Sequence, residues 1–457
     1  MEIRYQYTNA ELFEKIKGYR RDFHRYPETG WTEYRTSWRI AECLKELGYE
    51  VFVGDEVCGM NARMGLPSEE VAASCERRAR EEGVPESYME RMHGGCTGVV
   101  GVIHGLADAK AGRGMPGSTV ESAARVMSGL AVERTGRAMH GSVAIRFDID
   151  ALPMQERETE YNREYRSKHD EVMHACGHDG HAAAGLGLAE VLSLHRDKFC
   201  GEVRLIFQPA EEGCRGAKAV VEKGWLEDVN LFYSGHIGIG CRHIGEIAAC
   251  DRGFYATTKV DVHFHGKSAH AAKCPEEGRN ALLAGALFTV LAQDAVKAEQ
   301  KDKMVNIGKF VSGSGRNIIA ADAYLEAETR GRTTALNDEA YKAVERAARE
   351  AAAKYGVTVR LEKAGEAETT GSSSQLICFG EQAAAEMRTA DGFRGTACFE
   401  ASEDVAFMMN RVQECGGMAA YYMFGTPLRA EHHQNRFDFD EEVMRVMVDF
   451  YARLILD

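Results

Sequence analysis

Apolar residues in the first fifty positions recur with the period of an α-helix. Asn9 is a residue type that caps helices, and apolar positions three or four apart follow it. These positions are Leu12, Phe13, Ile16, Tyr19 and Phe23. A second helix is predicted over residues 32–48, where Gly48 ends it, and a strand over residues 49–54 follows.

Short apolar runs rich in β-branched residues come next. They cover residues 98–105, 141–150 and 201–213, and a helical stretch at 181–197 separates the last two. Alternation of strands with helices is typical of an α/β domain with a largely parallel sheet.

The pattern changes at Ala256 and gives the order β-α-β-β-α-β of the ferredoxin-like unit. Strands are predicted at 256–266, 303–313, 323–331 and 357–365, and helices at 279–297 and 338–356. We therefore predict a small domain over 254–365, inserted into a larger discontinuous α/β domain over 1–253 and 366–457.

Two segments of the larger domain stand outside this pattern. Residues 57–94 are charged and helix-like, and residues 106–140 are rich in Gly, Ala, Ser and Arg, with one predicted helix at 119–133. Both are interpreted as insertions that form solvated surface excursions.

Composition excludes several classes of protein. The 457 residues carry a net charge of −14, which argues against nucleic acid or an anionic membrane as the main partner. The longest apolar run, 281–292, is shorter than the roughly 20 residues of a membrane span. The N-terminal sequence lacks a secretory pattern, and the 13 scattered cysteines suggest free thiols. We expect a cytoplasmic protein that binds neither membrane nor nucleic acid.

Candidate chemistry gathers in "VMHACGHDGH", residues 172–181. Cys176 and His178 are two positions apart, and thiolate and imidazole are good ligands for zinc and similar metals. Glu211 and Glu212 follow a predicted strand, where adjacent side chains point to opposite sides, so one could bind a metal and the other face a water molecule.

Further histidines follow other predicted strands. His236 ends the run "LFYSGHIG", and His432 and His433 lie near the C-terminus. Taken together, one Cys, several His and one or two Glu form the ligand set of a hydrolytic metal centre with one or two metals.

The chain resembles the M20 family of metallopeptidases and amidohydrolases, in the subgroup that hydrolyses N-acyl, indole-acetyl and aminobenzoyl amino acids. The motifs that carry the resemblance run in order over nearly the whole chain. They are "RRDFHRYPETGWTEYRT", "IRFDIDALP", "MHACGHDGH", "FQPAEEG", "GHIG", "GKSAHAA", "GSGRNIIA" and "HHQNRFDFDEE". The segment 106–140 is longer than the corresponding segment of the family pattern. The resemblance implies a mixed-sheet metal-binding catalytic domain with an inserted lid or dimerisation domain.

The resemblance also implies roles for individual residues. The metal ligands would be Cys176, His178, Glu212, His236 and His433. His433 is preferred to His432 because it precedes Phe437 by four residues, as in the family. Glu211 would be the general base. Asp148 would orient a ligand histidine through a hydrogen bond, with Asp150 as the competing candidate.

Three residues of the inserted domain are implied to contact substrate. His270 would polarise the scissile carbonyl, often in the site of a partner protomer, and Asn317 and Arg330 would hold the substrate carboxylate. An exposed arginine without a ligand is the alternative for Arg330. Implied partners are a second copy, through the lid, and a related second subunit. The implied cofactors are two divalent metal ions, Mn or Zn.

The activity implied by the resemblance is hydrolysis of the amide bond of an N-acyl amino acid. The leading candidate substrate is p-aminobenzoyl-glutamate, a folate breakdown product, which would give p-aminobenzoate and glutamate. A deacetylase or a hydrolase of another acyl-amino acid or dipeptide is the first alternative. A non-catalytic metal-containing subunit of a hetero-oligomer is the second.

Overall fold

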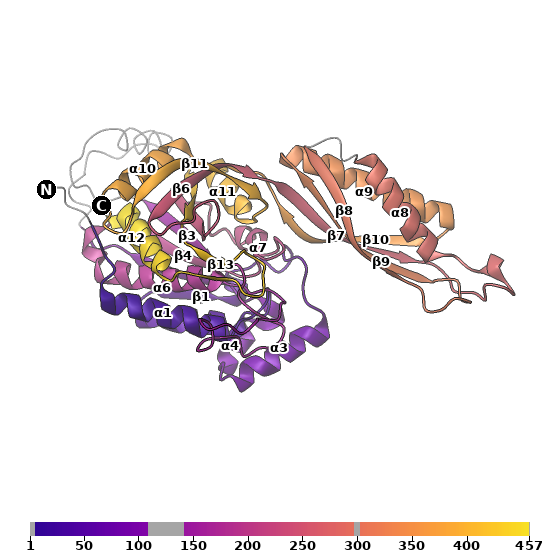
Figure 1. Cartoon of the computed structure of the whole chain (residues 1–457), viewed down its shortest axis with the longest axis horizontal. Coiled ribbons are helices and arrows are strands. Elements are labelled where there is room, and N and C mark those ends of the chain that lie inside the picture. The colour runs from indigo at the N-terminus through magenta and orange to yellow at the C-terminus, as the bar shows by residue number, and fades with distance from the viewer. Residues whose placement is uncertain (1–4, 108–140, 297–301, 457) are drawn as a thin grey trace.

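The computed structural model describes residues 5–107, 141–296 and 302–456, and it consists of a body and an elongated lid (Figure 1). The body holds an eight-stranded sheet in the order β1-β2-β4-β3-β5-β12-β6-β11. In that order the strands are Glu50–Val53, Val99–His104, Glu202–Gln208, Ser142–Asp148, Leu231–Ile237, Met418–Phe424, Glu246–Phe254 and Gly392–Ala401.

Helices cover both faces of this sheet. One face packs against α1, α2, α6, α10 and α12, which are Ala10–Arg25, Tyr34–Glu46, His178–Leu194, Ser374–Ala385 and Glu442–Leu456. The other face packs against α7 and α11, which are Ala217–Glu222 and Val405–Glu414. Strands β2, β3, β4 and β5 are buried along nearly their whole length and form continuous apolar runs, which is why the sequence pattern located them.

The sheet is mixed, as the family resemblance implies, whereas the strand pattern alone suggested a largely parallel one. The pairs β3–β4, β3–β5, β5–β12 and β6–β11 are parallel, whereas β1–β2, β2–β4 and β6–β12 are antiparallel. Strand direction depends on how the chain returns to the sheet. A fully buried strand has the same apolar composition in either direction, so the pattern could not reveal it.

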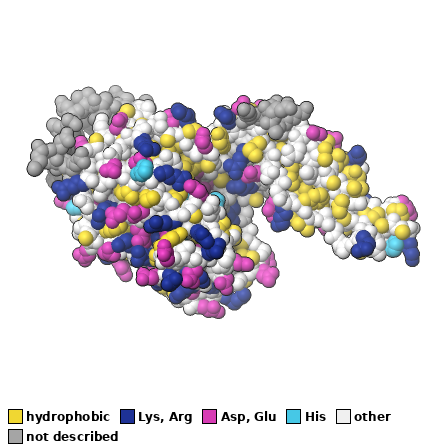
Figure 2. Space-filling view, viewed as in Figure 1, with side chains coloured by type: hydrophobic (Ala, Val, Ile, Leu, Met, Phe, Trp, Pro, Cys, Tyr) yellow, Lys and Arg dark blue, Asp and Glu magenta, His cyan; other side chains and the backbone are white. Residues whose placement is uncertain are grey.

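The lid has the predicted α/β order and the predicted topology. Its strands β7, β8, β9 and β10 are Ala256–His265, Lys303–Ser312, Asp322–Gly331 and Thr358–Ala367, and they form an antiparallel sheet in the order β10-β7-β9-β8. Helices α8 (Ala281–Ala295) and α9 (Thr334–Tyr355) pack on one face. Figure 2 shows hydrophobic side chains exposed over α8 and β8.

Residues 57–94, which were expected to form a solvated surface excursion, pack partly against the body. They form α3 (Glu69–Glu81), α4 (Glu86–Arg91) and the short turn η2 (His93–Gly95), and α3 and α4 lie beside α2. Cys75, Ala79 and Met89 are buried beneath their charged outer face. The predicted helix at 119–133, and residues 108–140 in general, lie outside the described residues.

Short elements complete the described chain. They are η1 (Gly54–Glu56), η4 (Arg196–Lys198), η5 (Pro275–Glu277), β13 (Leu428–Ala430) and β14 (Asp438–Phe439). Among the described residues, no helix combines the length and apolarity that crossing a membrane requires.

Candidate metal centre

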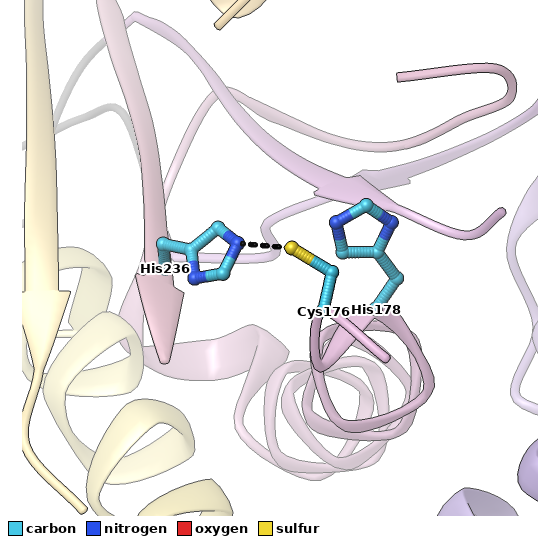
Figure 3. A group of neighbouring side chains, drawn as sticks. All are labelled: Cys176, His178 and His236. Atoms are coloured by element: carbon cyan, nitrogen blue, oxygen red, sulfur yellow. Dashed lines mark hydrogen bonds between the residues drawn. The ribbon is translucent and has the colours of Figure 1, made fainter. Parts of the chain in front are cut away.

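The predicted ligands meet where the central strands of the body end. Glu211 and Glu212 follow β4. His236 lies near the end of β5, and Cys176 and His178 lie at the start of α6 (Figure 3). The carboxyl ends of parallel strands are where α/β sheets form their binding sites. The strand-end positions noted in the sequence therefore converge in space.

Backbone conformation aims these side chains inward. Gly177 adopts φ 96°, which favours glycine, and it turns the chain so that Cys176 and the first helical residue, His178, face one site. Ala210 and His433 also have positive φ, at 53° and 61°. Such conformations in residues other than glycine are uncommon and concentrate at functional sites.

The five predicted ligands form two overlapping groups. The ligand atoms of Cys176, His178 and His236 lie within 4.8 Å of one another, and so do those of Cys176, Glu212 and His433. The Cys176 Sγ is 3.4 Å from His236 Nε2, and His433 Nε2 is 3.4 Å from Glu212 Oε1. A single thiol thus belongs to both groups.

Hydrogen bonds fix which ring nitrogens point into the site. His178 Nδ1 donates to the Asp150 carbonyl oxygen at 2.9 Å, and His236 Nδ1 donates to the Ile237 carbonyl oxygen at 2.8 Å. Each Nε2 is therefore left to present a lone pair when the ring is neutral. His178 Nε2 is fully buried and has no hydrogen-bond partner among the described residues. Buried polar atoms rarely stay unpaired, so this atom fits a metal ligand.

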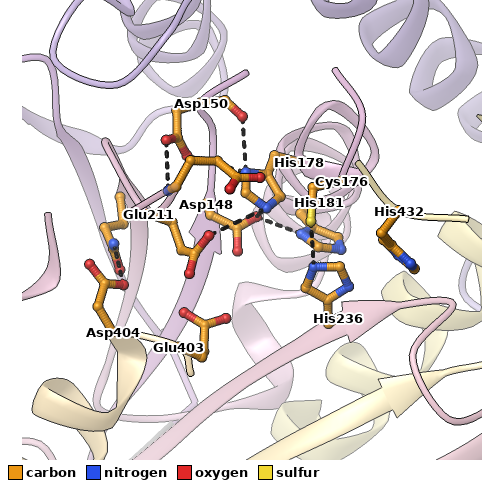
Figure 4. A network of polar contacts seen from close by, with 12 residues as sticks. Asp148, Asp150, Cys176, His178, His181, Glu211, His236, Glu403, Asp404 and His432 are labelled. Atoms are coloured by element: carbon orange, nitrogen blue, oxygen red, sulfur yellow. Dashed lines mark hydrogen bonds and ion pairs between the residues drawn. The ribbon is translucent and has the colours of Figure 1, made fainter. Parts of the chain in front are cut away.

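The two candidate aspartates hydrogen-bond different histidines. Asp150 hydrogen-bonds the proposed ligand His178, with its Oδ1 3.2 Å from Nδ1, and its Oδ2 accepts from the Glu212 backbone N–H at 2.9 Å (Figure 4). Asp148 Oδ1 lies 3.8 Å from His178 Nε2. Asp148 lies 2.5 Å from His181 Nδ1 and accepts from Arg146. Asp148 belongs to β3, whereas Asp150 has already left the strand and reaches the loops that carry the ligands.

The electrostatic surroundings of the two groups attract positive charge. Burial disfavours the charged form of His178, but Asp148 and Cys176 raise its pKa well above the usual value. Hydrogen bonds to Cys176 and Glu212 raise the pKa of His433 to about 10. A divalent cation would satisfy the same anionic field and displace these protons, so the residues present fit a metal.

Glu211 lies beside the ligands and is buried. Its ligand oxygen falls within 4.8 Å of those of His178 and Glu212. Burial and the neighbouring acids Glu403, Glu212 and Asp404 raise the pKa of Glu211 well above its ordinary value. A carboxyl group with a raised pKa can exchange a proton near neutral pH, which is the property of a general base.

Sequence reasoning missed a buried ionic network behind Glu211. Arg146 pairs with Asp148 at 2.7 Å, Glu403 at 3.1 Å and Asp404 at 3.4 Å, and it is fully buried. Asp404 also accepts from the backbone N–H groups of Gly216 and Ala217, in the turn that follows the two glutamates. The available signal was "SEDVAF", in which two adjacent acids directly precede the apolar run that forms α11.

The predicted substrate residues are divided between the two ends of the lid. Arg330 lies near the body, where its Nη1 donates to Ser402 Oγ at 3.3 Å. His270 and Asn317 lie together beyond the far end of β7, joined by a bond from the Ala271 N–H to the Asn317 carbonyl. The two ends of β7 are roughly 30 Å apart by strand rise. The lid extends away from the body (Figure 1). Within one chain, His270 and Asn317 are therefore remote from the proposed metal ligands.

A second buried network fixes the loop that carries His178. Arg20 of α1 pairs with Asp179 at 2.9 Å and with Asp438 at 2.6 Å, and it is fully buried. His24 contacts the same Asp179 carboxylate at 2.9 Å. Helix α1 thus holds the start of α6 in place.

Replacing Arg20 is expected to destabilise the fold. Arg20→Met leaves the buried Asp438 carboxylate without its cation and leaves Asp179 with His24 alone, which costs about 3–5 kcal/mol of unfolding free energy. Arg21→Met is the matched control, because Arg21 pairs with Glu441 on the partly exposed surface and should cost about 1 kcal/mol or less. Thermal unfolding of both variants measures the difference. Equal losses would contradict this account of Arg20.

Comparisons with known proteins identify the family of this chain. The sequence profile of peptidase family M20/M25/M40 matches residues 144–457. The chain is 38% identical over 452 residues to indole-3-acetyl-aspartic acid hydrolase of Enterobacter agglomerans, covering 98% of this chain and 96% of the relative. It is also 38% identical over 462 residues to one of the subunits of p-aminobenzoyl-glutamate hydrolase of Escherichia coli K12, covering 100% and 98%.

A solved structure extends the likeness to the whole fold. The aminobenzoyl-glutamate utilization protein of Klebsiella pneumoniae superposes with a TM-score of 0.78 at 33% identity, covering 98% of this chain and 96% of that one. The family match covers well over half of the chain, and the relatives span nearly all of it. The chain therefore belongs to peptidase family M20/M25/M40, and it is a metallohydrolase of that family.

Proposed function

We propose that this chain is a metal-dependent amidohydrolase that splits an aromatic acyl group from an acidic amino acid. The observation that carries the proposal is the convergence of five ligand side chains with the buried acid Glu211. Two relatives are named for p-aminobenzoyl-glutamate and indole-3-acetyl-aspartic acid, which share an aromatic acyl group and an acidic amino acid. p-Aminobenzoyl-glutamate is the first candidate substrate and indole-3-acetyl-aspartate the second.

Two divalent ions, Mn or Zn, fit the donor set. One would be held by Cys176, His178 and His236, and the other by Cys176, Glu212 and His433. Thiolate favours zinc, while carboxylate and imidazole also suit manganese. When bound, such ions supply a Lewis acid for the amide carbonyl and for water.

The side chains around the ligands perform the proton transfers. Glu211 takes a proton from water and returns it to the leaving nitrogen, so the amino acid departs as a neutral amine. Asp150 holds His178 in one tautomer and fixes the Glu212 backbone, which keeps the ligands oriented. A purely structural metal site has no need of Glu211, which argues against the non-catalytic alternative.

A substrate panel tests this proposal. The chain loaded with Mn²⁺ or Zn²⁺ should release the amino acid from p-aminobenzoyl-glutamate or indole-3-acetyl-aspartate, measured by amine detection. Its kcat/KM for the better of the two should exceed that for N-benzoyl-glycine by about tenfold or more, equivalent to about 1.4 kcal/mol. A preference for N-acetyl amino acids or dipeptides would favour the first alternative. Full metal loading with no amide hydrolysis would favour the second.

We further propose that two copies associate through their lids. Strand β8 is an edge of the lid sheet, and Met304, Phe310 and Val311 on it are 44%, 40% and 57% exposed. Exposed apolar edge strands are natural pairing surfaces. The remote position of His270 and Asn317 supports an arrangement in which the lid of one copy completes the site of the other.

The oligomeric state tests the lid surface. Light scattering after size exclusion should give the mass of two chains for the wild type, and Val311→Asp should shift it toward one, because a charge on the paired edge is costly to bury. Leu194→Asp, at an exposed leucine of the body, should leave the mass unchanged. A wild-type mass of one chain, measured on this chain alone, would contradict the homodimer and make a related second chain the candidate partner.

A further inference from the structure

Lys259 is a lid residue whose side chain faces the metal centre. It lies on β7, where Val260 and Val262 point into the lid core beneath α8 and α9. Side chains alternate along a strand, so Lys259 projects from the opposite, helix-free face of the lid sheet. Figure 2 shows Lys and Arg side chains at the junction of body and lid.

The lid docks directly on the loop that carries the two glutamates. The Glu366 backbone N–H, on β10, donates to the Cys214 carbonyl oxygen at 2.8 Å. The Lys259 Nζ lies 3.7 Å from the Cys214 Sγ. Cys214 is two residues beyond Glu212, and its φ of 60° marks a tight turn. The ammonium group of Lys259 is therefore held next to the metal ligands.

Lys259 lacks a close counter-ion. Within residues 5–107, 141–296 and 302–456, no carboxylate oxygen lies within 4.0 Å of its Nζ. Its cross-strand neighbour Glu328 is engaged by Arg330, with Nη2 to Oε2 at 3.2 Å and Nε to Oε1 at 3.3 Å. The arginine that the sequence suggested for substrate binding is thus already paired, whereas the lysine beside it has no ion pair in the described chain.

We propose that Lys259 binds the side-chain carboxylate of the acidic amino acid in the substrate. This inference rests on the proposed function, since it names the group that distinguishes acidic from neutral acyl-amino acids at that site. A partly buried ammonium group without a close counter-ion favours an anionic ligand, because a charge-assisted hydrogen bond compensates for its lost hydration. The Cys214 thiol is a weak acceptor and would be replaced readily.

A pair of substrates that differ in one group tests the assignment. p-Aminobenzoyl-glutamate and p-aminobenzoyl-glutamine have nearly the same shape, but only the first carries a side-chain carboxylate. Lys259→Met should lower kcat/KM for the glutamate compound by about 10- to 100-fold, the usual effect of losing a charged hydrogen bond. It should change kcat/KM for the glutamine compound by less than about threefold. Lys259→Arg should retain part of the preference for the glutamate compound over the glutamine compound that Lys259→Met loses.

Binding measurements separate this inference from the proposed activity. Glu211→Gln should bind both compounds without cleaving them, and calorimetry on Glu211→Gln with and without Lys259→Met gives the same comparison when no turnover occurs. The matched control is Lys354→Met, which removes an exposed lysine of α9. It should change neither the ratio of kcat/KM nor the ratio of affinities between the glutamate and glutamine compounds.

Each outcome decides the question. A selective loss of the glutamate compound, by kinetics or by binding, supports the role of Lys259 even if the wild type proves to cleave another amide. Equal losses for both compounds would overturn it, because Lys259 would then act on a shared group or on the fold. No loss for either compound would overturn it as well.

Discussion

Glu211→Gln is expected to abolish turnover while the metal content of the protein stays unchanged. Glutamine keeps the size of the side chain but cannot accept a proton, so the loss should be at least about 100- to 10,000-fold in kcat, the usual contribution of a general base. Glu211 sits among the proposed ligands but is not needed for either group of ligands that shares Cys176. Activity and elemental analysis on the same sample measure both effects.

A matched substitution controls for the change of charge. Glu190→Gln removes a carboxylate from α6, where its partner is the exposed Lys15. It should leave kcat within about twofold, since surface ion pairs contribute little. Wild-type turnover in Glu211→Gln would remove Glu211 from the mechanism. Loss of metal in that variant would instead place Glu211 among the ligands.

Cys176→Ala is expected to have the largest effect on metal binding. Its thiol belongs to both groups of ligands, so one substitution weakens two sites. Changes to groups that merely support a ligand already cost about 10- to 100-fold in affinity, and removing the ligand itself should cost at least as much. The metal content measured by elemental analysis after dialysis should fall from about two ions per chain in the wild type to less than one in Cys176→Ala.

The exposed thiol of Cys415 provides the comparison. Cys415→Ala alters a cysteine at the end of α11, away from the site, and should retain the full metal content. Unchanged metal content in Cys176→Ala would exclude Cys176 from the site. Equal losses in both variants would mean that thiol oxidation or unfolding, rather than ligation, controls the metal content.

Periodicity in the sequence predicted much of the fold because local patterns encode it. Asn9 caps α1 by accepting from the Leu12 N–H, and the apolar positions after it form the buried side of that helix. The lid was predicted in its full β-α-β-β-α-β order, and its central strands β7 and β9 alternate between buried and more exposed positions. Strand direction in the body was not predictable in this way, since it depends on long-range connections.

The candidate site likewise contains some residues that the sequence predicted and others that it did not. The proposed metal ligands could be selected from the sequence because their residue types are rare together and most of them lie at strand ends. The sequence left Asp148 and Asp150 as competing candidates because two acids separated by one residue look alike in a sequence. The fold shows that Asp150 hydrogen-bonds His178 and Asp148 hydrogen-bonds His181. Arg146 and Lys259 drew no attention, because a single cation on a strand signals nothing until its neighbours are known.

Metal dependence of amide hydrolysis tests the central claim most directly. Chelator-stripped protein, titrated with Mn²⁺ or Zn²⁺, is assayed for release of glutamate from p-aminobenzoyl-glutamate and of aspartate from indole-3-acetyl-aspartate. We predict no release without metal and a rate that rises with metal bound, up to about two ions per chain. Hydrolysis at the full rate in the stripped protein would contradict a metal-dependent amidohydrolase at Cys176, His178, Glu212, His236 and His433.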